Sequence, residues 1–181
     1  MNTKFWGAPG WDFLHTITFN YPEKIDKSNK DDVERMKYTK RLFNDLQYTL
    51  PCKYCRQSYK EFLKQEPIEP NLDSRQAITH WFYRVHNLVN DKLRKQELEA
   101  VDKRTNELEA DVSSGKLTSK QAHKILKEFV HRTMITEKDP QFSDVCAKYE
   151  AQRASCAKPK DGIASCRSND RTPDRTRRSR R

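Results

Sequence analysis

The chain has 181 residues and a net charge of +10, and 34% of its residues are hydrophobic and 34% charged. This length allows one domain with a hydrophobic core and additional segments. Only four glycines and no alternating apolar run argue against a β-sheet protein. No apolar run reaches the roughly 18 residues that a membrane span needs. The sequence therefore predicts an all-α protein with no membrane partner.

The positive charge is concentrated at the C-terminal end of the chain. Residues 151–181 hold ten Lys or Arg and three Asp or Glu, a net +7, which leaves +3 for residues 1–150. From residue 158 onward no hydrophobic period is present, so we expect a disordered basic tail. Two roles are open for it: a solvated tail, or a tail that binds nucleic acid through phosphates.

The cysteines and the N-terminus bear on the compartment. The stretch before Trp6 has no apolar region of a signal peptide, so we expect no secretion by a signal of the chain's own. An odd number of cysteines without such a signal does not indicate an extracellular disulfide framework. We expect instead one reactive pair and a second, C-terminal group. The five cysteines are Cys52, Cys55, Cys146, Cys156 and Cys166.

The first predicted helix, of about three turns, lies between the Gly and Pro residues at 7–10 and Pro22. Trp11, His15 and Thr18 share one of its faces, at spacings i, i+4 and i+7. Two interpretations of Trp11 and His15 are open. They pack in the core with the histidine satisfied there, or they contact a ligand.

A second helix is predicted over 33–50, and Pro51 ends it. Cys52 and Cys55 follow Pro51 and precede another helical pattern, so one thiol is expected at a helix N-terminus and the other one turn inside. That end of a helix favours negative charge, and at least one thiol is therefore expected to have a lowered pKa and to be a nucleophile. Because the CxxC spacing also supplies half of many zinc sites, both redox chemistry and metal binding are open at this point.

The next predicted helix opens with a capping box in which Asp73 is the N-cap and Gln76 lies three residues later. His86 falls on the apolar stripe of this helix, and Asn87 and Asn90 lie at the same end. Buried polar groups must find hydrogen-bond partners. Several of them together near a core suggest that a polar ligand supplies some of those partners.

Residues 94–137 predict a helical hairpin. Apolar residues recur at steps of three and four up to residue 112, Ser113-Ser114-Gly115-Lys116 interrupts the pattern, and a capping box over 118–121 opens a second helix. A surface elaboration or packing arm is favoured over a catalytic role.

Three motifs in the chain resemble the Erv/ALR sulfhydryl oxidases in identity, order and spacing, over residues 5–93. They are Trp6-Gly7-x3-Trp11-x2-Leu14-His15, Pro51-Cys52-x2-Cys55 and Trp81-x4-His86-Asn87-x-Val89-Asn90-x-Lys92. The resemblance favours redox chemistry for the CxxC. It implies a four-helix bundle with a short fifth helix, and FAD at the mouth of the bundle.

The resemblance also implies the activity and the site. The chain would be an FAD-dependent sulfhydryl oxidase that forms disulfides in protein thiols and passes the electrons to molecular oxygen, giving hydrogen peroxide. Cys52 would meet incoming thiols and Cys55 would lie against the flavin. The cofactor-binding residues implied are Trp6, Gly7, Trp11, His15, Cys55, His86, Asn87, Asn90, Lys92 and Tyr149.

A homodimer is implied too, associating through the first helices. The family members that the chain most resembles are those of large cytoplasmic DNA viruses, which implies the host cytoplasm and possible packaging in the virion rather than the mitochondrial intermembrane space. The alternative function is a zinc-stabilised helical module that binds nucleic acid through its basic tail, with Cys52, Cys55 and a histidine as ligands.

The predicted division of the chain is helices 1–4 of the oxidase core over 1–93, the inserted hairpin over 94–137, the final core helix over 138–157 and the tail over 158–181. Asp139-Pro140-Gln141-Phe142 resembles the family's final segment. A continuous helix would separate Cys146 and Cys156 by about 15 Å, whereas a disulfide needs Cα atoms within about 7 Å. Either the helix ends before Cys156 or the two are not partners.

Two arrangements of the C-terminal cysteines therefore remain open. In one, Cys146 pairs with Cys156 beside the last helix and Cys166 is a spare thiol. In the other, Cys156 and Cys166 form a pair on the flexible tail that passes electrons from substrate to Cys52 and Cys55.

Overall fold

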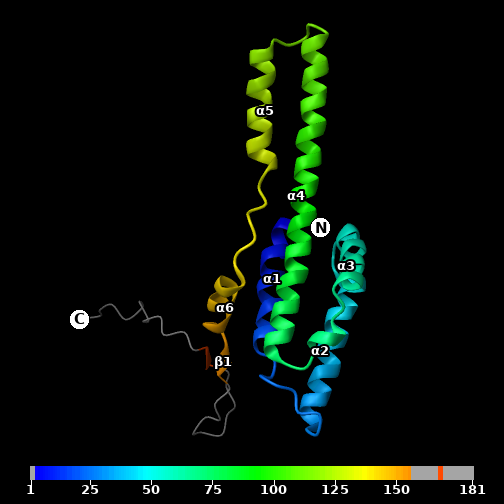
Figure 1. Cartoon of the computed structure of the whole chain (residues 1–181), viewed down its shortest axis with the longest axis vertical. Coiled ribbons are helices and arrows are strands. Elements are labelled where there is room, and N and C mark those ends of the chain that lie inside the picture. The colour runs from blue at the N-terminus through cyan, green and yellow to red at the C-terminus, as the bar shows by residue number, and fades with distance from the viewer. Residues whose placement is uncertain (1–2, 156–166, 169–181) are drawn as a thin grey trace, which may run out of the picture. The chain divides into compact units, whose positions relative to one another are not determined.

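The computed structural model describes residues 3–155 and 167–168, and the all-α prediction is confirmed (Figure 1). The chain divides into two compact units, which are described separately. Unit 1 comprises residues up to 83 and from 140 onward, and unit 2 comprises residues 84–139. The helices are α1 (Thr3–Phe19), α2 (Lys30–Thr49), α3 (Lys53–Gln65), α4 (Arg75–Ser113), α5 (Ser119–Thr133) and α6 (Phe142–Glu150), with a 3-10 turn η1 (Glu69–Asn71).

Helix α1 begins earlier than the sequence pattern predicts. It starts at Thr3 and contains Pro9 in its interior, although a proline there lacks the N–H for one helical hydrogen bond. The adjacent Gly10 lies under the ring of Trp6, and a Cβ at Gly10 would be 3.6 Å from a Trp6 ring carbon. Trp6 and Gly10 lie one helical turn apart, at spacing i, i+4, and pack against each other. The helix is therefore continuous through the Gly and Pro residues that were predicted to precede it.

Aromatic side chains form the centre of unit 1. Trp81 and Phe43 are fully buried, and their rings meet edge to face at 5.2 Å. The indole N–H of Trp81 donates to the Glu66 carbonyl at 2.9 Å, so its one polar group is satisfied. Truncation of such a side chain to Ala typically costs about 3 to 5 kcal/mol, so these rings are a main source of the unit's stability.

Two buried tyrosine hydroxyls fasten segments of this core. Tyr59 on α3 donates to the carbonyl of Phe43 on α2 at 3.0 Å, and Tyr21 donates to the Leu72 carbonyl at 2.8 Å. Burial raises the pKa of Tyr21 to about 12 and also raises the pKa of Tyr59. Both hydroxyls therefore remain protonated donors at neutral pH.

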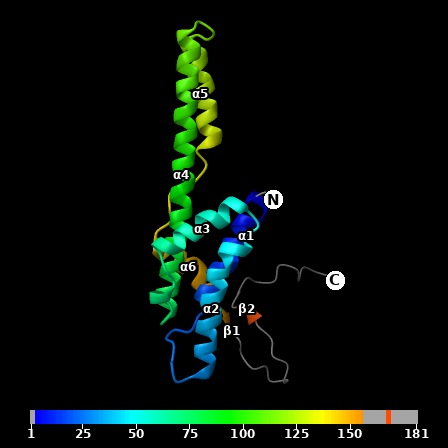
Figure 2. The ribbon, with the colours of Figure 1, turned by 90° about the vertical axis from the view of Figure 1, so that its right-hand side faces the viewer.

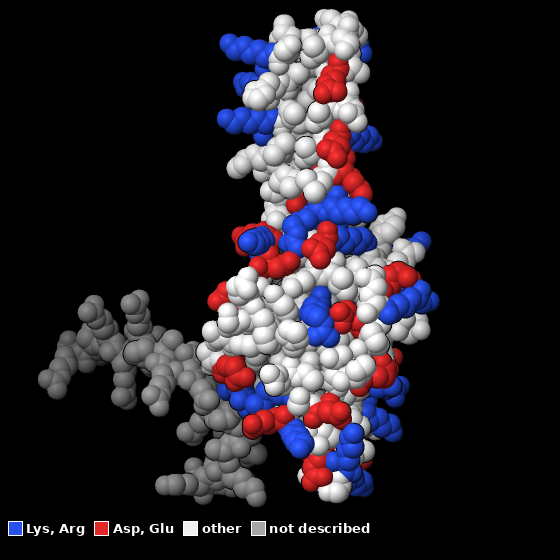
Figure 3. Space-filling view, viewed as in Figure 1, with Lys and Arg blue, Asp and Glu red and all other residues white. Residues whose placement is uncertain are grey.

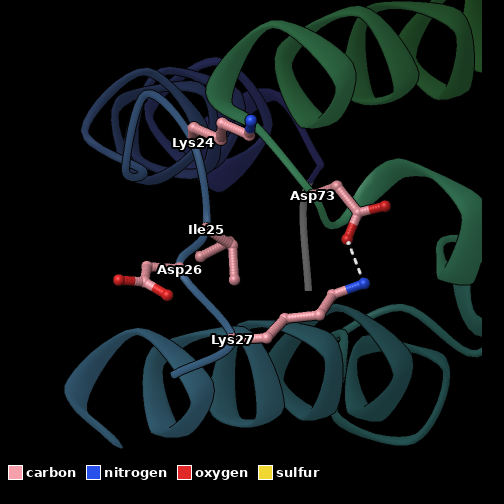
Figure 4. A pocket seen from close by; sticks show the side chains of 5 residues that line it. All are labelled: Lys24, Ile25, Asp26, Lys27 and Asp73. Atoms are coloured by element: carbon pink, nitrogen blue, oxygen red, sulfur yellow. Dashed lines mark ion pairs between the residues drawn. The ribbon is translucent and has the colours of Figure 1, made fainter. Parts of the chain in front are cut away.

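The N-cap of α4 differs from the prediction. The cap is Ser74, whose hydroxyl accepts the N–H of Ala77 at 3.2 Å, and not Asp73. The carboxylate of Asp73 instead pairs with Lys27 at 3.2 Å, and its carbonyl accepts the N–H of Ile25 at 2.9 Å. Asp73 is thus engaged with the loop after α1, at the edge of a shallow surface hollow that Lys24, Ile25, Asp26 and Lys27 complete (Figure 4).

Helix α6 packs in unit 1 through both of its ends. At its start, the Tyr83 hydroxyl donates to the Pro140 carbonyl at 2.9 Å, and the ring of His80 meets that of Phe142 edge to face at 4.7 Å. Towards its end, Val145 and Tyr149 are buried with Phe19. Helix α6 ends at Glu150, that is, before Cys156. This is the condition that the sequence sets for a Cys146–Cys156 pair. Cys156 and Cys166 lie outside the described residues, and their pairing stays a prediction.

Unit 2 contains residues 84–113 of α4, the whole of α5 and the segment that follows it. The expected hairpin forms, with Gly115 at φ 75°, a left-handed conformation that glycine adopts without penalty. The predicted capping box at α5 is confirmed, because Thr118 and Gln121 each bond the backbone of the other. The predicted division of the chain into domains stays a prediction.

The C-terminal segment is described only in part. Strands β1 (Ala154–Ser155) and β2 (Arg167–Ser168) pair antiparallel, with Ala154 opposite Ser168. At Arg167 and Ser168 the structure thus differs from the predicted disordered tail, because their backbone groups join a short ladder. The remainder of the tail lies outside the described residues. Among the helices of the described chain, none combines the length and apolarity needed to cross a membrane.

We expect Tyr59→Phe to lower the free energy of unfolding by about 1 kcal/mol, because it removes a buried hydrogen bond between α2 and α3. Urea denaturation followed by circular dichroism measures the change. Tyr48→Phe is the matched control, since Tyr48 is 71% exposed and its loss should stay within about 0.5 kcal/mol. Equal effects of the two substitutions would contradict this role of Tyr59.

Candidate dithiol site and aromatic cluster

The corner between α2 and α3 positions the two central cysteines (Figure 2). Leu50 caps the end of α2, and its N–H still donates to Leu46 at 3.1 Å. Pro51 follows, and α3 begins two residues later. The guanidinium of Arg56, in the first turn of α3, donates to the Leu50 carbonyl at 2.6 Å. The predicted tight corner is therefore present, and Arg56 braces it.

Cys52 is the N-cap of α3, and its Sγ accepts the N–H of Cys55 at 3.2 Å. The sulfur thus takes the place that a Ser or Asp oxygen usually has at this position. Both cysteines are half-buried, and both carry thiols rather than a disulfide in this structure. The prediction of one thiol at the helix N-terminus and one a turn inside is confirmed.

The surroundings of Cys52 lower the pKa of its thiol. The largest cause is a hydrogen bond from the Cys55 side chain; the backbone N–H groups of Cys55 and Tyr54 add to it, and burial opposes it. Cys146 shows the reverse, because burial and then Glu150 raise the pKa of its thiol. A thiol with a lowered pKa is more often a thiolate and also leaves more readily from a disulfide. Of Cys52 and Cys146, Cys52 is therefore the one whose surroundings favour the thiolate.

The structure brings three of the predicted site residues together in a second cluster of unit 1. His15 is 2% exposed, and its ring stacks on that of Tyr149 at 4.7 Å and 18°. Phe82 meets the His15 ring edge to face at 4.7 Å and lies 5.4 Å from the ring of Trp11. Trp11 and His15 of α1 thus contact Phe82 of α4, and Tyr149 of α6 joins the cluster through His15.

Asp12 organises this cluster, and the sequence patterns did not identify it. Its Oδ1 accepts the hydroxyl of Tyr149 at 2.6 Å and the ammonium of Lys148 at 2.7 Å. The hydrogen bonds from Lys148 and then Tyr149 hold the pKa of the Asp12 carboxyl below its usual range, against a small effect of burial. Because 137 residues separate Asp12 from Tyr149, no local pattern could have revealed the contact.

Trp6 and Gly7 were predicted from the resemblance alone. The indole Nε1 of Trp6 is buried and has no hydrogen-bond partner in the part of the chain that the structure describes. A buried donor without an acceptor costs free energy, so this N–H is suited to a bound acceptor. At Gly7 a Cβ would meet no described atom within 4 Å, so packing does not explain the glycine.

The remaining predicted residues, His86, Asn87, Asn90 and Lys92, lie on α4 in unit 2 and are half-buried. The side-chain amide of Asn90 donates to Oδ1 of Asp139 at 2.7 Å. This gives the amide a partner within the protein and fixes its orientation.

The segment before α6 is tied to α4 by a row of polar residues, among which sequence reasoning missed Arg94 and Glu97. Arg94 binds Asp139 through Nη2 at 2.6 Å, and Glu97 accepts the Thr136 hydroxyl at 2.6 Å. Burial alone would raise the pKa of Asp139, but the hydrogen bonds of Arg94 and Asn90 outweigh it and lower that pKa. The signal was present as the i, i+4, i+7 spacing of 90, 94 and 97, although their partner could not be read from it.

A metal site receives no support from the side-chain positions. Within residues 3–155 and 167–168, no three His, Cys, Asp or Glu side chains come together as a possible ligand set. The zinc-stabilised alternative therefore lacks its ligands in this part of the chain.

The fold and the capped CxxC together define a helical dithiol protein. The chain belongs to the Erv1 / Alr family, whose model matches residues 8–111. Both Cys52 and Cys55 lie in the matched segment, as do Trp11, His15 and the four predicted residues of α4.

The relatives span plants, fungi and a virus. FAD-linked sulfhydryl oxidase ERV1 of Arabidopsis thaliana is 36% identical over 110 residues, which are 60% of this chain and 53% of that protein. A probable FAD-linked sulfhydryl oxidase of Acanthamoeba polyphaga mimivirus is 33% identical over 91 residues, 50% of this chain and 59% of that protein. A solved mutant structure of Erv1 from Saccharomyces cerevisiae aligns at 22% identity with a TM-score of 0.45, over 52% of this chain and 73% of that chain. The chain thus spans about half the length of the curated relatives it matches.

We expect Cys52 to be alkylated at lower pH than Cys146 when the reduced protein reacts with iodoacetamide, because the pKa of Cys52 is lowered and that of Cys146 is raised. Peptide mass spectrometry of samples quenched across a pH series gives the midpoint for each cysteine. Replacement of Cys55 by Ala should move the Cys52 midpoint upward, since the Cys55 side chain is the largest cause of the shift. Coincident midpoints for Cys52 and Cys146 would contradict the assignment.

Proposed function

We propose that the chain is an FAD-linked sulfhydryl oxidase that forms disulfides in protein thiols through Cys52 and Cys55 and passes the electrons to molecular oxygen. The observation that carries the proposal is the environment of Cys52 within a CxxC of the segment matched by the family. A hydrogen bond from the Cys55 side chain, with the backbone N–H groups at the cap of α3, lowers the pKa of the Cys52 thiol. The names of the relatives support the choice of FAD and of thiol substrates.

The residues present suit FAD as a cofactor. The buried Trp6 N–H has no described acceptor. The half-buried Trp11 offers an aromatic face for a planar ring system, and the buried ring of His15 lies 6.4 Å from it. The polar residues of α4 suit the other parts of the molecule: Asn87 and Asn90 for hydrogen bonds, and Lys92 for a phosphate. Gly7, His86, Cys55 and Tyr149 complete the proposed set. When bound, FAD accepts two electrons from the reduced cysteine pair and transfers them to oxygen.

The oxidation of substrate begins with the Cys52–Cys55 disulfide. A substrate thiolate attacks Sγ of Cys52, a new S–S bond forms there, and Cys55 leaves with the electron pair of the broken bond. In the reduced state, the backbone N–H and the side chain of Cys55 already form hydrogen bonds with the Cys52 sulfur. The two sulfurs therefore remain close throughout the exchange.

Release of the product depends on Cys52. A second substrate thiolate attacks the substrate sulfur of the mixed disulfide, and Cys52 leaves as a thiolate. The lowered pKa of Cys52 makes it the better leaving group. Two substrate thiols have then become one disulfide, and their two electrons reside on Cys52 and Cys55.

A homodimer is part of the proposal. Phe13 of α1 is 65% exposed, and Tyr38 and Leu42 of α2 are 54% and 39% exposed. Large apolar side chains on the first two helices suit an interface between two copies of the chain. The mimivirus relative favours the expected viral origin, with the host cytoplasm as the compartment.

We expect Cys52→Ser and Cys55→Ser each to reduce oxidation of dithiothreitol to background, because disulfide exchange needs both sulfurs. Oxygen consumption measures turnover, and the absorbance near 450 nm measures the flavin-to-protein ratio, which should stay unchanged.

Cys146→Ser is the matched control, since Cys146 has a raised pKa and lies beside the α6 cluster. It should retain both activity and flavin. Near wild-type turnover in either CxxC variant would sink the mechanism, and purified protein without flavin would remove the cofactor from the proposal.

For the dimer, light scattering at micromolar concentration should give twice the mass of the chain, and Phe13→Glu should shift it towards the monomer. Leu98→Glu, at a similarly exposed position of unit 2 (53%), is the control and should leave the mass unchanged. A wild-type monomer would remove the homodimer.

A further inference from the structure

Helix α5 lies outside the segment that the family model matches, residues 8–111, so the proposed oxidase activity does not account for it. One face of this helix is made of Lys and His residues alone, and it is called the α5 basic face below. Its members are Lys120, His123, Lys124, Lys127 and His131.

Helical geometry gathers these five residues tightly. Successive residues of an α-helix are about 100° apart, and on that basis the five fall within an arc of about 100°, in which no other residue of α5 lies. All five are exposed. The opposite arc is apolar and half-buried, with Ile125 and Phe129 at its centre, and Phe129 shares a surface groove with Ala100 and Arg104 of α4. Packing of the apolar arc therefore fixes the basic face towards solvent.

The lysines of this face are not neutralised. Within the described residues no ion pair involves Lys120, Lys124 or Lys127, whereas Lys40 pairs with Glu69 and Lys64 with Glu61. Figure 3 shows Lys and Arg side chains projecting from the α5 side of this unit, while Asp and Glu follow the α4 side. An unneutralised row of like charges on a rigid helix is a surface for an anionic partner.

The composition of the face selects among anionic partners. A protein interface usually has a desolvated centre with apolar or aromatic anchors, and a membrane-bound helix inserts an apolar face. The α5 basic face has no apolar member, and the apolar side of α5 is the half-buried one. Single-stranded nucleic acid is held largely by stacking on aromatic rings, and the face has no such ring except its two imidazoles. The phosphate backbone of a duplex is bound by positive charge without a need for apolar or stacking contacts, so it is the partner that this composition favours.

We propose that the α5 basic face binds the phosphate backbone of double-stranded nucleic acid, without sequence preference. The rise of 1.5 Å per residue places Lys120 and Lys127 about 10.5 Å apart along the axis, and Lys120 and His131 about 16.5 Å apart. A duplex carries one charge per about 1.7 Å of its axis, so this row can meet several phosphates. The proposal is independent of the oxidase chemistry. It adds a second basic surface to the tail, for which the sequence leaves nucleic-acid binding as one of two open roles.

The test compares two triple variants of the full chain with equal net charge. In the basic-face variant, Lys120→Gln, Lys124→Gln and Lys127→Gln together remove the proposed phosphate-binding charges. In the control variant, Lys30→Gln, Lys60→Gln and Lys95→Gln together remove three exposed lysines elsewhere. Both variants keep the basic tail, so its contribution is common to them. Glutamine retains helix propensity, and circular dichroism checks that both variants fold.

Fluorescence anisotropy of a labelled DNA duplex of about two helical turns measures binding between about 50 and 200 mM NaCl. We expect the basic-face variant to bind more weakly and its slope of log K against log salt to fall in magnitude by about 3, one for each phosphate that is no longer bound. The control variant should match the wild type. The same titration with a single strand, and with vesicles containing anionic lipid, should show no selective loss in the basic-face variant.

Three outcomes would overturn the proposal. The first is an equal loss of duplex affinity in the two variants, which would assign the binding to net charge. The second is a wild-type chain that binds no duplex. The third is a selective loss of affinity confined to single strands or vesicles, which would assign the face to those partners.

Discussion

The turn from α2 into α3 is the constraint on which the dithiol site depends. Pro51 cannot donate the backbone hydrogen bond that would continue α2, and the next helix, α3, begins with Cys52 as its N-cap. The corner is held from three directions: Arg56 binds the Leu50 carbonyl, Tyr59 binds the Phe43 carbonyl, and the Cys52 sulfur takes the Cys55 amide. The bonds of Arg56 and Cys52 satisfy backbone atoms at helix ends, and that of Tyr59 joins α3 to the interior of α2. The Cys52 sulfur is therefore one of the groups that hold the corner on which it lies.

A second constraint joins the two ends of unit 1. Asp12 on the first helix accepts hydrogen bonds from Lys148 and Tyr149 on the last, and the Tyr149 ring lies on His15. Closing a loop of this length costs conformational entropy that changes slowly with its length, and burial of Tyr149 and Val145 with Phe19 offsets part of it. The Asp12 carboxylate is more than half exposed, so its ion pair with Lys148 adds orientation more than stability. Its main consequence is to fix the Tyr149 hydroxyl, and with it the ring that covers the imidazole.

Local chemistry was predictable from the sequence, and long-range chemistry was not. The CxxC corner, the hairpin at Gly115 and the Thr118 capping box follow from residues close together in the chain, and the structure confirms all three. The predicted start of α1 was wrong because Trp6 packs across Gly10 and the helix runs through Pro9. The predicted N-cap of α4 was wrong by one residue because Asp73 is engaged with Lys27. The hydrogen bonds of Asp12 and Asp139 join residues 45 or more apart, and no periodicity encodes them.

The cap formed by Cys52 links the oxidation state of the site to an amide proton. In the reduced protein the Cys55 N–H donates to a sulfur whose thiol has a lowered pKa, and the bond is stronger when that sulfur is a charged thiolate. In the Cys52–Cys55 disulfide the same sulfur is uncharged and its bonding electrons are shared with Cys55. The resonance of the Cys55 amide in a nitrogen-15 correlation spectrum is thus an internal reporter of whether the dithiol is reduced or oxidised, read from the backbone without a label on either sulfur.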